Sequence, residues 1–543
     1  MVRRFLECFW DELYAEYCLL DDPQVTREDN LIVHSDPTSN RAFGQVRSWI
    51  ETCETSHKKC IDNGKAKPFP SRLLDLGDSR TSSVEIVLRK TEGQTGRYVA
   101  LSHCWGSSQP FTTTRSTLES RQNGFSIHDT PATFRDAIRI TRMLKIRYLW
   151  IDSLCIVQDN PNDWQRESAQ MGDIYSNAYL TIAADKAAAD TEGFLAPRVI
   201  PYVHLDIVLT SRQHVRIGLL ADSDRSNLSQ LPPDEEEPLR HRAWAMQERY
   251  LSPRILHFNS WVIKWCCREL TCGEGVSRDS HHPESKIDNI FPSTYSSRRS
   301  PLSNDTCDDM LSYLGWYRIL EHYTSCLLTI ESDRFPALSG IARAVCRSRG
   351  DQYHAGLWRR DMERGLLWRT KGTISRPQNW RAPSWSWASV NGTVSYEDIG
   401  AGYNASNLKD RSKISKTVVK SIATKPAGLD PFGEVKSSVL RMEGPLLRLE
   451  LDVPAKKLVF QDLRLNPDPR NWSCDVEGEV MEGCVGLPLV SNGATDLFKI
   501  LVQKQKKGYL RKGFFSFKGL SPKEYRRLSA VLESHPVEDI FII

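Results

Sequence analysis

Three short apolar runs, each ending in polar residues, dominate the hydrophobic pattern of this chain. They cover Tyr98–Gly106, Tyr148–Ile156 and Ala178–Asp185. Two segments in which apolar residues recur at helical spacing lie between these runs. The order strand, helix, strand, helix, strand predicts an α/β fold, because each crossover between parallel strands lays a helix over a face of the sheet. We therefore expect a parallel sheet with helices on both faces.

Polar residues gather where the predicted strands end. Ser102 and His103 lie at the end of the first strand, Asp152 at the end of the second and Asp185 at the end of the third. The carboxyl ends of parallel strands share one edge of a sheet, and ligands of such sheets bind outside that edge. The sequence therefore predicts a binding site at this edge.

The two connecting segments each predict an amphipathic helix. The first opens at Thr130–Pro131, a capping residue followed by proline at the first helical position. The second opens at Asn160–Asn162, with Asn162 as the expected cap. Its spacing places Tyr175 toward the core and Glu167 on a different side. The expected buried residues of the two helices are Phe134, Ala137, Ile138, Thr141 and Leu144, then Trp164, Met171 and Ile174.

The chain of 543 residues is too long for one core, and its pattern changes along its length. A strand pair is expected at Ile255–Phe258 and Trp261–Cys267, and polar, Pro-rich loops at 221–240 and 279–305. The predicted parts are a helical lead-in (1–97), the α/β domain (98–258), a strand pair with a linker (259–305), a helical region (306–379) and a β-rich region (380–543).

Charge and composition narrow the classes of protein. A net charge of +4 is small for this length and requires neither a nucleic acid nor a membrane surface as a partner. No stretch approaches 18 apolar residues, and Glu7, Asp11 and Glu12 interrupt the start where a signal peptide would be apolar. The 14 cysteines form no dense framework, which indicates reduced thiols. We expect a cytoplasmic protein.

A basic stretch near the C-terminus carries aromatic residues. Lys504–Lys512 and Lys518–Arg527 could contact RNA or anionic lipid. A charged β-hairpin at a domain edge is favoured instead, because lysines commonly protect exposed strand edges from pairing.

Cysteine and histidine residues suggest two kinds of chemistry, neither of which the spacing favours. Cys53, His57 and Cys60 have helical spacing but lack an obvious fourth metal ligand, so packing against the core is preferred. The same interpretation holds for Cys266, Cys267 and Cys272. We therefore predict no metal site.

A cysteine protease is equally disfavoured. His103 and Cys104 are neighbours on a strand, so their side chains point to opposite faces and cannot form a working pair. Cys155 is expected to be a small buried apolar residue.

Six motifs in one order resemble the fungal heterokaryon incompatibility (HET) domain. They are Tyr98–Gly106, Thr133–Ile138, Tyr148–Asp159, Asp163–Met171, Ile174–Ala178 and Arg242–Glu248, the last leading into Leu251–Phe258. The resemblance implies a fungal source and a role in non-self recognition, in which fusion of unlike hyphae triggers growth arrest or cell death. It also implies self-association or other incompatibility proteins as partners. Arg381–Ser389 resembles a segment common downstream of HET domains, without an evident mechanism.

A more distant similarity is to Toll/interleukin-1 receptor (TIR) domains, which have a flavodoxin-like sheet and of which some cleave NAD. Their catalytic glutamate follows a Trp-Cys pair, and Trp244–Glu248 keeps that spacing with Ala245 in place of the cysteine. The similarity implies Glu248 as the catalytic residue and NAD as a substrate, without a cofactor or metal. Residues implied to bind the substrate are Trp244, Ser102, Asp152 and Trp105.

Plainer roles remain open for the two acids. Glu248 could instead form an ion pair with Arg242 or Arg249, and Asp152 could stabilise a turn through its own backbone. Two functions therefore compete: a nucleotide-cleaving death effector, and a scaffold that acts through domain assembly without catalysis. A domain that folds but no longer signals is disfavoured because every motif is intact. The enzymatic hypothesis predicts that Glu248, Trp244, Asp152 and Ser102 converge on one cleft, with Cys155 buried beneath it.

Overall fold

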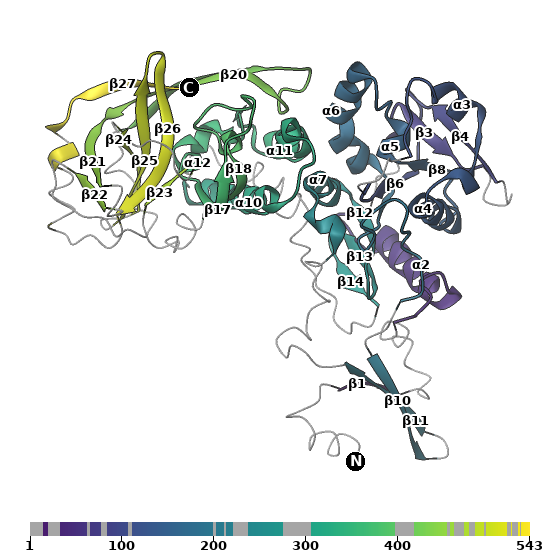
Figure 1. Cartoon of the computed structure of the whole chain (residues 1–543). Coiled ribbons are helices and arrows are strands. Elements are labelled where there is room, and N and C mark those ends of the chain that lie inside the picture. Colours follow the sequence, from purple (N-terminus) through teal and green to yellow (C-terminus); the bar gives the residue numbers. More distant parts are fainter. Residues whose placement is uncertain are drawn as a thin grey trace. The chain divides into compact units, whose positions relative to one another are not determined.

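The chain divides into two compact units, Met1–Asn289 and Ile290–Ile543 (Figure 1). The computed structural model describes residues 15–19, 33–61, 66–77, 84–106, 111–198, 202–210, 213–220, 237–274, 306–396, 417–452, 457–460, 472–476, 484–492, 496–517, 523, 530–532 and 534–543. The loops expected at 221–240 and 279–305 lie almost wholly outside the described residues, as does most of the basic stretch 518–527. Among the described residues, no helix has the length and apolar character needed to cross a membrane.

The first unit is built on a mixed sheet of nine strands within the described residues, in the order β14-β13-β12-β9-β6-β8-β3-β4-β7. The strands are β3 (Arg72–Asp75), β4 (Glu85–Lys90), β6 (Tyr98–Ser102), β7 (Phe125–Ser126), β8 (Tyr148–Trp150), β9 (Leu180–Ala183), β12 (Arg254–Phe258), β13 (Ile263–Cys267) and β14 (Thr271–Gly273).

The centre of this sheet is parallel. β6 pairs in parallel with β8 on one side and β9 on the other, and β9 pairs in parallel with β12. When these four strands are numbered by their order along the chain, they lie side by side in the order 2-1-3-4. This is the strand order of flavodoxin-like sheets. The strand order reverses between β6 and β9, and such a switch point is where ligands of this class of sheet bind.

Helices cover both faces of the parallel strands. α4 (Ala132–Met143) connects β6 to β8, α6 (Pro161–Asn177) connects β8 to β9, and α7 (Ala243–Leu251) lies between β9 and β12. Because such crossovers are right-handed, α4 covers one face and α6 and α7 the other, and α6 packs against α7 (Figure 1). The predicted α/β class with helices on both faces is confirmed. The remaining described helices around the sheet are α2 (Asn40–Thr55), α3 (Leu118–Asn123), α5 (Asp152–Cys155) and the 3₁₀ turns η2 (Ile127–Asp129) and η4 (Pro238–His241).

The outer strands are antiparallel, which the sequence pattern did not indicate. β3 and β4 precede residue 98 and extend the sheet beyond β8, whereas β13 and β14 follow residue 258 and extend it beyond β12. The sheet therefore uses strands from both sides of the segment predicted as the α/β domain. The expected strand pair is β12 with β13.

The two connecting helices bury most of the residues that their spacing indicates. Phe134, Ala137 and Ile138 of α4 are buried in the core, as are Met171, Ile174 and Tyr175 of α6. Two predictions about α6 were wrong. Its cap is Asn160, whose side chain accepts from the amides of Asn162 and Asp163, and Glu167 is only 1% exposed rather than outside the core.

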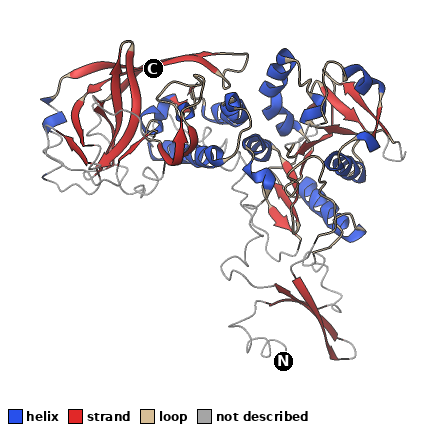
Figure 2. Cartoon of the chain, in the orientation of Figure 1, coloured by secondary structure: helices blue, strands red, loops and turns tan. Residues whose placement is uncertain are grey.

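The second unit combines a helical part with a largely antiparallel sheet (Figure 2). Its helices are α10 (Thr306–Ser325), α11 (Pro336–Arg349), α12 (Met362–Gly365) and the 3₁₀ turns η5 (Glu331–Arg334), η6 (Arg359–Asp361) and η7 (Trp387–Ser389). Among the described residues the large sheet has the order β19-β20-β27-β26-β25-β24-β21-β22, with β23 on β26. These strands are β19 (Val418–Pro426), β20 (Val435–Pro445), β21 (Leu447–Asp452), β22 (Lys457–Phe460), β23 (Trp472–Cys474), β24 (Cys484–Asn492), β25 (Asp496–Gln505), β26 (Gly508–Phe517) and β27 (Val537–Ile542).

Small antiparallel sheets complete the described chain. They are β1 (Ala15–Leu19) with β11 (Gln213–Leu220) and β10 (Tyr202–Thr210), β2 (Lys67–Pro68) with β5 (Thr95–Gly96), β15 (Tyr353–His354) with β16 (Leu357–Trp358), and β17 (Arg369–Ser375) with β18 (Asn391–Ser395).

The described part of the basic stretch is a hairpin, but not an edge hairpin. β25 and β26 form it, and both lie inside the large sheet with neighbours on each side. Arg511 on β26 is fully buried, where its guanidinium binds the Asp475 carboxylate at 3.0 Å and lies 3.4 Å from the centre of the Trp368 ring. Arg511 thus serves the core, and a role in nucleic-acid binding gains no support from it.

The segment Arg381–Ser389 is a packing element of the second unit. Trp385 and Trp387 are fully buried, and the Trp387 indole donates to the carbonyl oxygen of Gly356 at 3.1 Å. The Arg381 guanidinium donates to the carbonyl oxygens of Ala388 and Val390, each at 2.9 Å. These contacts account for its composition without any catalytic role.

Candidate functional site

A small cavity lies at the switch point between β6 and β9. The strands contribute Ser102 and Thr181, and α7 contributes Glu248. The other lining residues are Ala183, Asp185, Leu239, Ala245, Arg249, Ile255 and His257. The cavity therefore occupies the sheet edge where the sequence predicts a site.

Glu248 is a buried acid in this cavity. Its side chain comes from α7, which the sequence Ala243–Leu251 forms with small and apolar residues packed inward, and only 5% of the residue is exposed. Burial, followed by the negative charge of Asp152, raises the pKa of Glu248 from 4.5 to about 7. Hydrogen bonds from Ser102 and Tyr175 and the positive charge of Arg242 limit this rise. Near neutral pH the carboxyl therefore exchanges readily between its two protonation states.

Two hydroxyl groups fix the position of the Glu248 carboxyl. Ser102 is the last residue of β6, so its side chain reaches the sheet edge. Tyr175, on α6, lies within hydrogen-bond reach of both the Glu248 carboxyl and the carbonyl oxygen of Leu101, 3.0 Å away, and its single hydroxyl proton serves one of these acceptors at a time. Its ring packs edge-on against Trp150. An acid held by buried hydroxyls keeps one orientation, which both catalysis and a structural role require.

Asp152 lies beside this site rather than in the cavity wall. One carboxylate oxygen accepts from the Trp105 indole at 2.9 Å, and the other accepts from the amide of Ser153 at 2.7 Å. The turn-stabilising role considered for Asp152 is therefore present, and the same carboxylate also orients an indole at the sheet edge. Its charge also reaches Glu248, as described above.

His103 and Cys104 are both electrically neutral in this environment. Burial lowers the pKa of His103 to about 4, partly offset by the charge of Asp152, whose carboxylate oxygen lies 3.8 Å from Nδ1. Burial raises the pKa of Cys104 to about 11. These directions oppose a thiolate–imidazolium pair, so the geometry agrees with the argument against a cysteine protease.

Arg242 links the site to the loop before α7. Its guanidinium donates to the carbonyl oxygen of His103, and its positive charge acts on both Glu248 and Cys104. Of the two arginines considered as ion-pair partners of Glu248, Arg242 acts on it electrostatically and favours its charged form.

Two polar contacts at or next to the cavity wall were not predicted from the sequence. His257 on β12 and Asp185 after β9 lie 2.7 Å apart between Nδ1 and Oδ2, and both are buried. Thr181 and Ser252 share a hydrogen bond of 2.7 Å between their hydroxyl groups. The signal that could have found His257 is a polar residue in an apolar strand that follows the third parallel strand.

The structure brings together part of the predicted set. Ser102 and Glu248 line the cavity and share a hydrogen bond, whereas Trp105 and Asp152 form a second pair beside them. Trp244 is partly buried against the hydrophobic core and does not line the cavity.

Cys155 is buried as expected. Its backbone, however, belongs to the Arg72 network described next rather than to the cavity wall.

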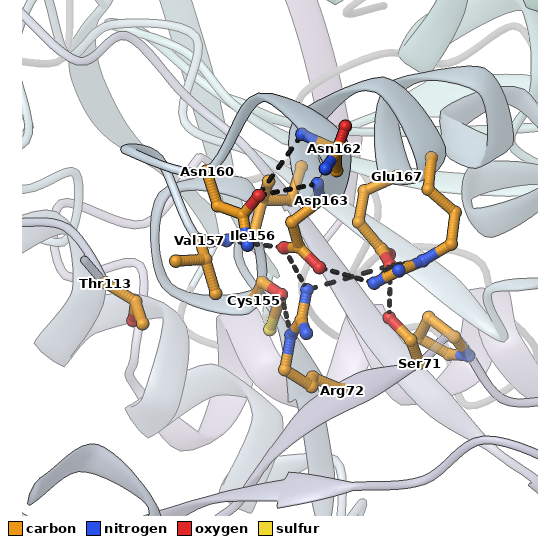
Figure 3. A network of polar contacts seen from close by, with 12 residues as sticks. Ser71, Arg72, Thr113, Cys155, Ile156, Val157, Asn160, Asn162, Asp163 and Glu167 are labelled. Atoms are coloured by element: carbon orange, nitrogen blue, oxygen red, sulfur yellow. Dashed lines mark hydrogen bonds and ion pairs between the residues drawn. The ribbon is translucent and has the colours of Figure 1, made fainter. Parts of the chain in front are cut away.

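A buried network of charged residues lies close to the carboxyl end of β8 (Figure 3). The Arg72 guanidinium donates to the carbonyl oxygen of Cys155 at 2.6 Å and to the Asp163 carboxylate at 2.5 Å. Asp163 also accepts from the amide of Val157 at 2.8 Å, and Glu167 accepts from the Ser71 hydroxyl at 2.7 Å. The network fastens the start of α6 to β3, so the acids of the Asp163–Met171 motif have a structural role.

Comparison with known protein families identifies the segment that carries the cavity. Residues 98–248 match the family model described as Heterokaryon incompatibility protein (HET). The match ends at Glu248 and includes Ser102 and Asp152. No curated protein and no solved structure matches the chain.

Proposed function

We propose that this chain has a function of the heterokaryon incompatibility type, because residues 98–248 match the HET family model, and that it acts by cleaving NAD. In this proposal the protein is a cell-death effector of non-self recognition, and Glu248 is its catalytic residue. The observation that carries the proposal is a buried carboxyl with a pKa of about 7 at the switch point of a flavodoxin-like sheet. The proposal includes a cytoplasmic location.

The reaction requires a carboxylate close to the ribose that carries nicotinamide. The bond between ribose C1′ and the nicotinamide nitrogen breaks, and nicotinamide leaves with the bonding electrons. Water then attacks C1′ and releases a proton, which gives ADP-ribose. Positive charge develops on the ribose in the transition state, and the ionised Glu248 would stabilise it at short range in a site of low dielectric.

The neighbours of Glu248 fit this role. Ser102 and Tyr175 would hold the carboxylate in one orientation, so that little reorganisation accompanies the reaction. The Trp105 indole, oriented by Asp152, offers a flat apolar surface at the sheet edge. The cationic nicotinamide ring would itself favour ionisation of Glu248.

Substrate access requires the site to open. The cavity volume is about 10 Å³, room for about one water molecule and far below the roughly 300–1,000 Å³ of typical ligand pockets. Catalysis by this site therefore implies a movement of α7 or of the loop before it, and assembly of the domain could supply that movement.

The test is NAD consumption and nicotinamide release by the purified full chain, wild type against Glu248→Gln. We expect Glu248→Gln to lower kcat at least 100-fold with a smaller effect on KM, and kcat/KM of the wild type to rise with pH through about 7. Glu119→Gln, the same chemical change at an exposed position of α3, should leave the rate unchanged. Equal rates for wild type and Glu248→Gln would contradict the proposal.

The closed cavity also favours a second function, a scaffold that acts through self-association or through other incompatibility proteins. Under this alternative Glu248 is a structural acid, and Glu248→Gln would retain toxicity on expression in a fungal host. Loss of toxicity together with loss of NAD cleavage would favour the enzyme, whereas retained toxicity without NAD cleavage would favour the scaffold.

A further inference from the structure

Four side chains that could bind a metal ion meet at the end of β13, away from the cavity described above. Cys53 lies in the last turn of α2, His57 and Cys60 lie in the turn that follows, and Cys267 ends β13. One potential ligand atom from each side chain lies within 4.8 Å of the other three. Cys267 is the fourth ligand that the local spacing of the first three did not show.

The chemistry of this set is specific. Three sulfur atoms and one imidazole nitrogen form the Cys₃His combination typical of structural zinc sites. With zinc–sulfur bonds of about 2.3 Å, sulfur atoms around a tetrahedral ion are separated by about 3.8 Å, so small side-chain adjustments close the site. Cys267 Sγ and His57 Nδ1 are already 3.3 Å apart. Four protein ligands leave no position open for substrate, which indicates a structural ion.

The backbone around the cluster holds the ligands in place. The amide of Leu270 donates to Cys267 Sγ at 3.3 Å, and the amide of Cys267 donates to the carbonyl oxygen of Leu270 at 2.9 Å. In the other loop the amide of Cys60 donates to the carbonyl oxygen of His57 at 2.9 Å. The two loops also contact each other, because the amide of Lys59 donates to the Glu269 carboxylate. Hydrogen bonds of this kind orient metal ligands from outside the coordination sphere.

A buried arginine matches the charge of the occupied site. Three thiolates, a neutral imidazole and Zn²⁺ together carry a charge of −1, which is costly to bury alone. Arg254, which is 3% exposed, donates to Cys53 Sγ at 3.4 Å and to the carbonyl oxygen of Cys60 at 2.8 Å. Arg254 stands opposite Cys267 in the pairing of β12 with β13. A cation in this position offsets the net charge of a zinc tris-thiolate centre.

We propose that Cys53, His57, Cys60 and Cys267 bind one structural Zn²⁺ ion that joins α2 to β13. His57 and Cys267 are 210 positions apart, on opposite sides of the HET-matched segment. The ion would therefore fasten the chain before this segment to the chain after it, and keep β13, the strand next to the edge strand β14, attached to α2. The cavity at Glu248 has no part in this proposal.

Metal analysis of the purified full chain tests it. We expect about one zinc ion per chain after dialysis into metal-free buffer, and at least a tenfold loss of zinc in Cys267→Ser and in Cys53→Ser. Cys266→Ser is the matched control: it changes the neighbouring cysteine of the same strand, whose side chain points to the other face and accepts from the Thr271 hydroxyl at 3.3 Å. Cys266→Ser should keep its zinc.

Cobalt substitution keeps the test valid if the cysteine variants do not fold. Wild-type protein refilled with Co²⁺ should show the visible absorption of a tetrahedral cobalt site together with thiolate charge-transfer bands. His57→Cys should still bind one ion and shift this spectrum toward that of a four-thiolate site. A role in packing alone would produce no such shift.

Three results would overturn the proposal. One is wild-type protein that holds no zinc even after reconstitution with Zn²⁺. Another is a disulfide bond among Cys53, Cys60 and Cys267, detected by mass spectrometry of the freshly purified, unreduced chain. The third is iron in place of zinc, which would identify a different metal centre.

Discussion

Ser102, at the carboxyl end of β6, hydrogen-bonds the carboxyl of Glu248 on α7 at the switch point of the parallel strands. This contact joins the first and the last motif of the HET-matched segment. Because one residue ends a strand and the other lies on a helix that follows a long insertion, only the fold brings them together. The pKa of Glu248 therefore depends on residues from several elements of the fold.

Glu248 should make the protein less stable as the pH rises. Its pKa is about 7 in the folded chain and near 4.5 when unfolded, so the folded state binds more protons between these values. The contribution of the neutral carboxyl is present at pH 4.5 and is lost as the pH rises to about 7, by up to about 3 kcal/mol. Denaturant unfolding of wild type and Glu248→Gln at pH 5 and pH 8 measures this: the variant should gain stability relative to wild type at the higher pH.

Ser102→Ala provides the control for that experiment. The Ser102 hydroxyl favours the charged form of Glu248, so its removal should raise the pKa of this carboxyl further and move the pH dependence to higher pH. A relative stability of wild type and Glu248→Gln that does not change with pH would mean that Glu248 titrates as an ordinary exposed acid.

His103 should oppose folding in acid. Burial lowers its pKa from 6.5 to about 4, so between these values the unfolded chain binds the proton and the folded chain does not. Stability from the neutral imidazole is complete above pH 6.5 and is lost as the pH falls to about 4, by up to about 3 kcal/mol. His103→Gln should reduce this acid sensitivity. The check is the urea midpoint from pH 7 to pH 4, with His128→Gln, at an exposed position, as the comparison.

Removal of one partner of the Arg72–Asp163 ion pair should lower the free energy of unfolding. Both side chains are less than a tenth exposed, and Asp163 also accepts from the amide of Val157 (Figure 3). Asp163→Asn and Arg72→Met should each cost part of the about 3–5 kcal/mol of a broken buried pair, because Arg166 still pairs with Asp163 and Glu167 still lies 3.7 Å from Arg72. The double variant should lose less than the sum of the two. Additive losses in chemical unfolding would show that the two side chains act independently.

The parallel core was predictable because short, local stretches of sequence specify its strands. Each apolar run bounded by polar residues forms one central strand, and the right-handed crossover rule then orders the helices on the two faces. The outer strands were not predictable in the same way. β3 pairs antiparallel with β8 across a long stretch of chain, and nothing in the residues of 72–90 specifies β8 as the neighbour.

The residues of the candidate site also differ in whether local sequence could identify them. Ser102, Asp152 and Asp185 were found because they end predicted strands, whereas His257 and Tyr175 depend on which elements become neighbours. Glu167 was misplaced because helical spacing alone cannot show that an arginine from β3 enters the helix face. Cys267 was missed as a partner of Cys53 for the same reason, since the two come from elements far apart in sequence.

Removal of the proposed zinc ion should destabilise the first unit selectively. A ligand bound at about 1,000 times its dissociation constant stabilises the folded state by about 4 kcal/mol, and a strong chelator abolishes this contribution. For a domain of this size such a loss corresponds to a fall in Tm on the order of 10 °C. Differential scanning calorimetry of the full chain with and without chelator measures the shift. Cys266→Ser should show the same shift as wild type, and Cys267→Ser should already melt at the lower temperature and respond no further to the chelator. A chelator shift of equal size in Cys267→Ser would mean that the metal acts elsewhere in the chain.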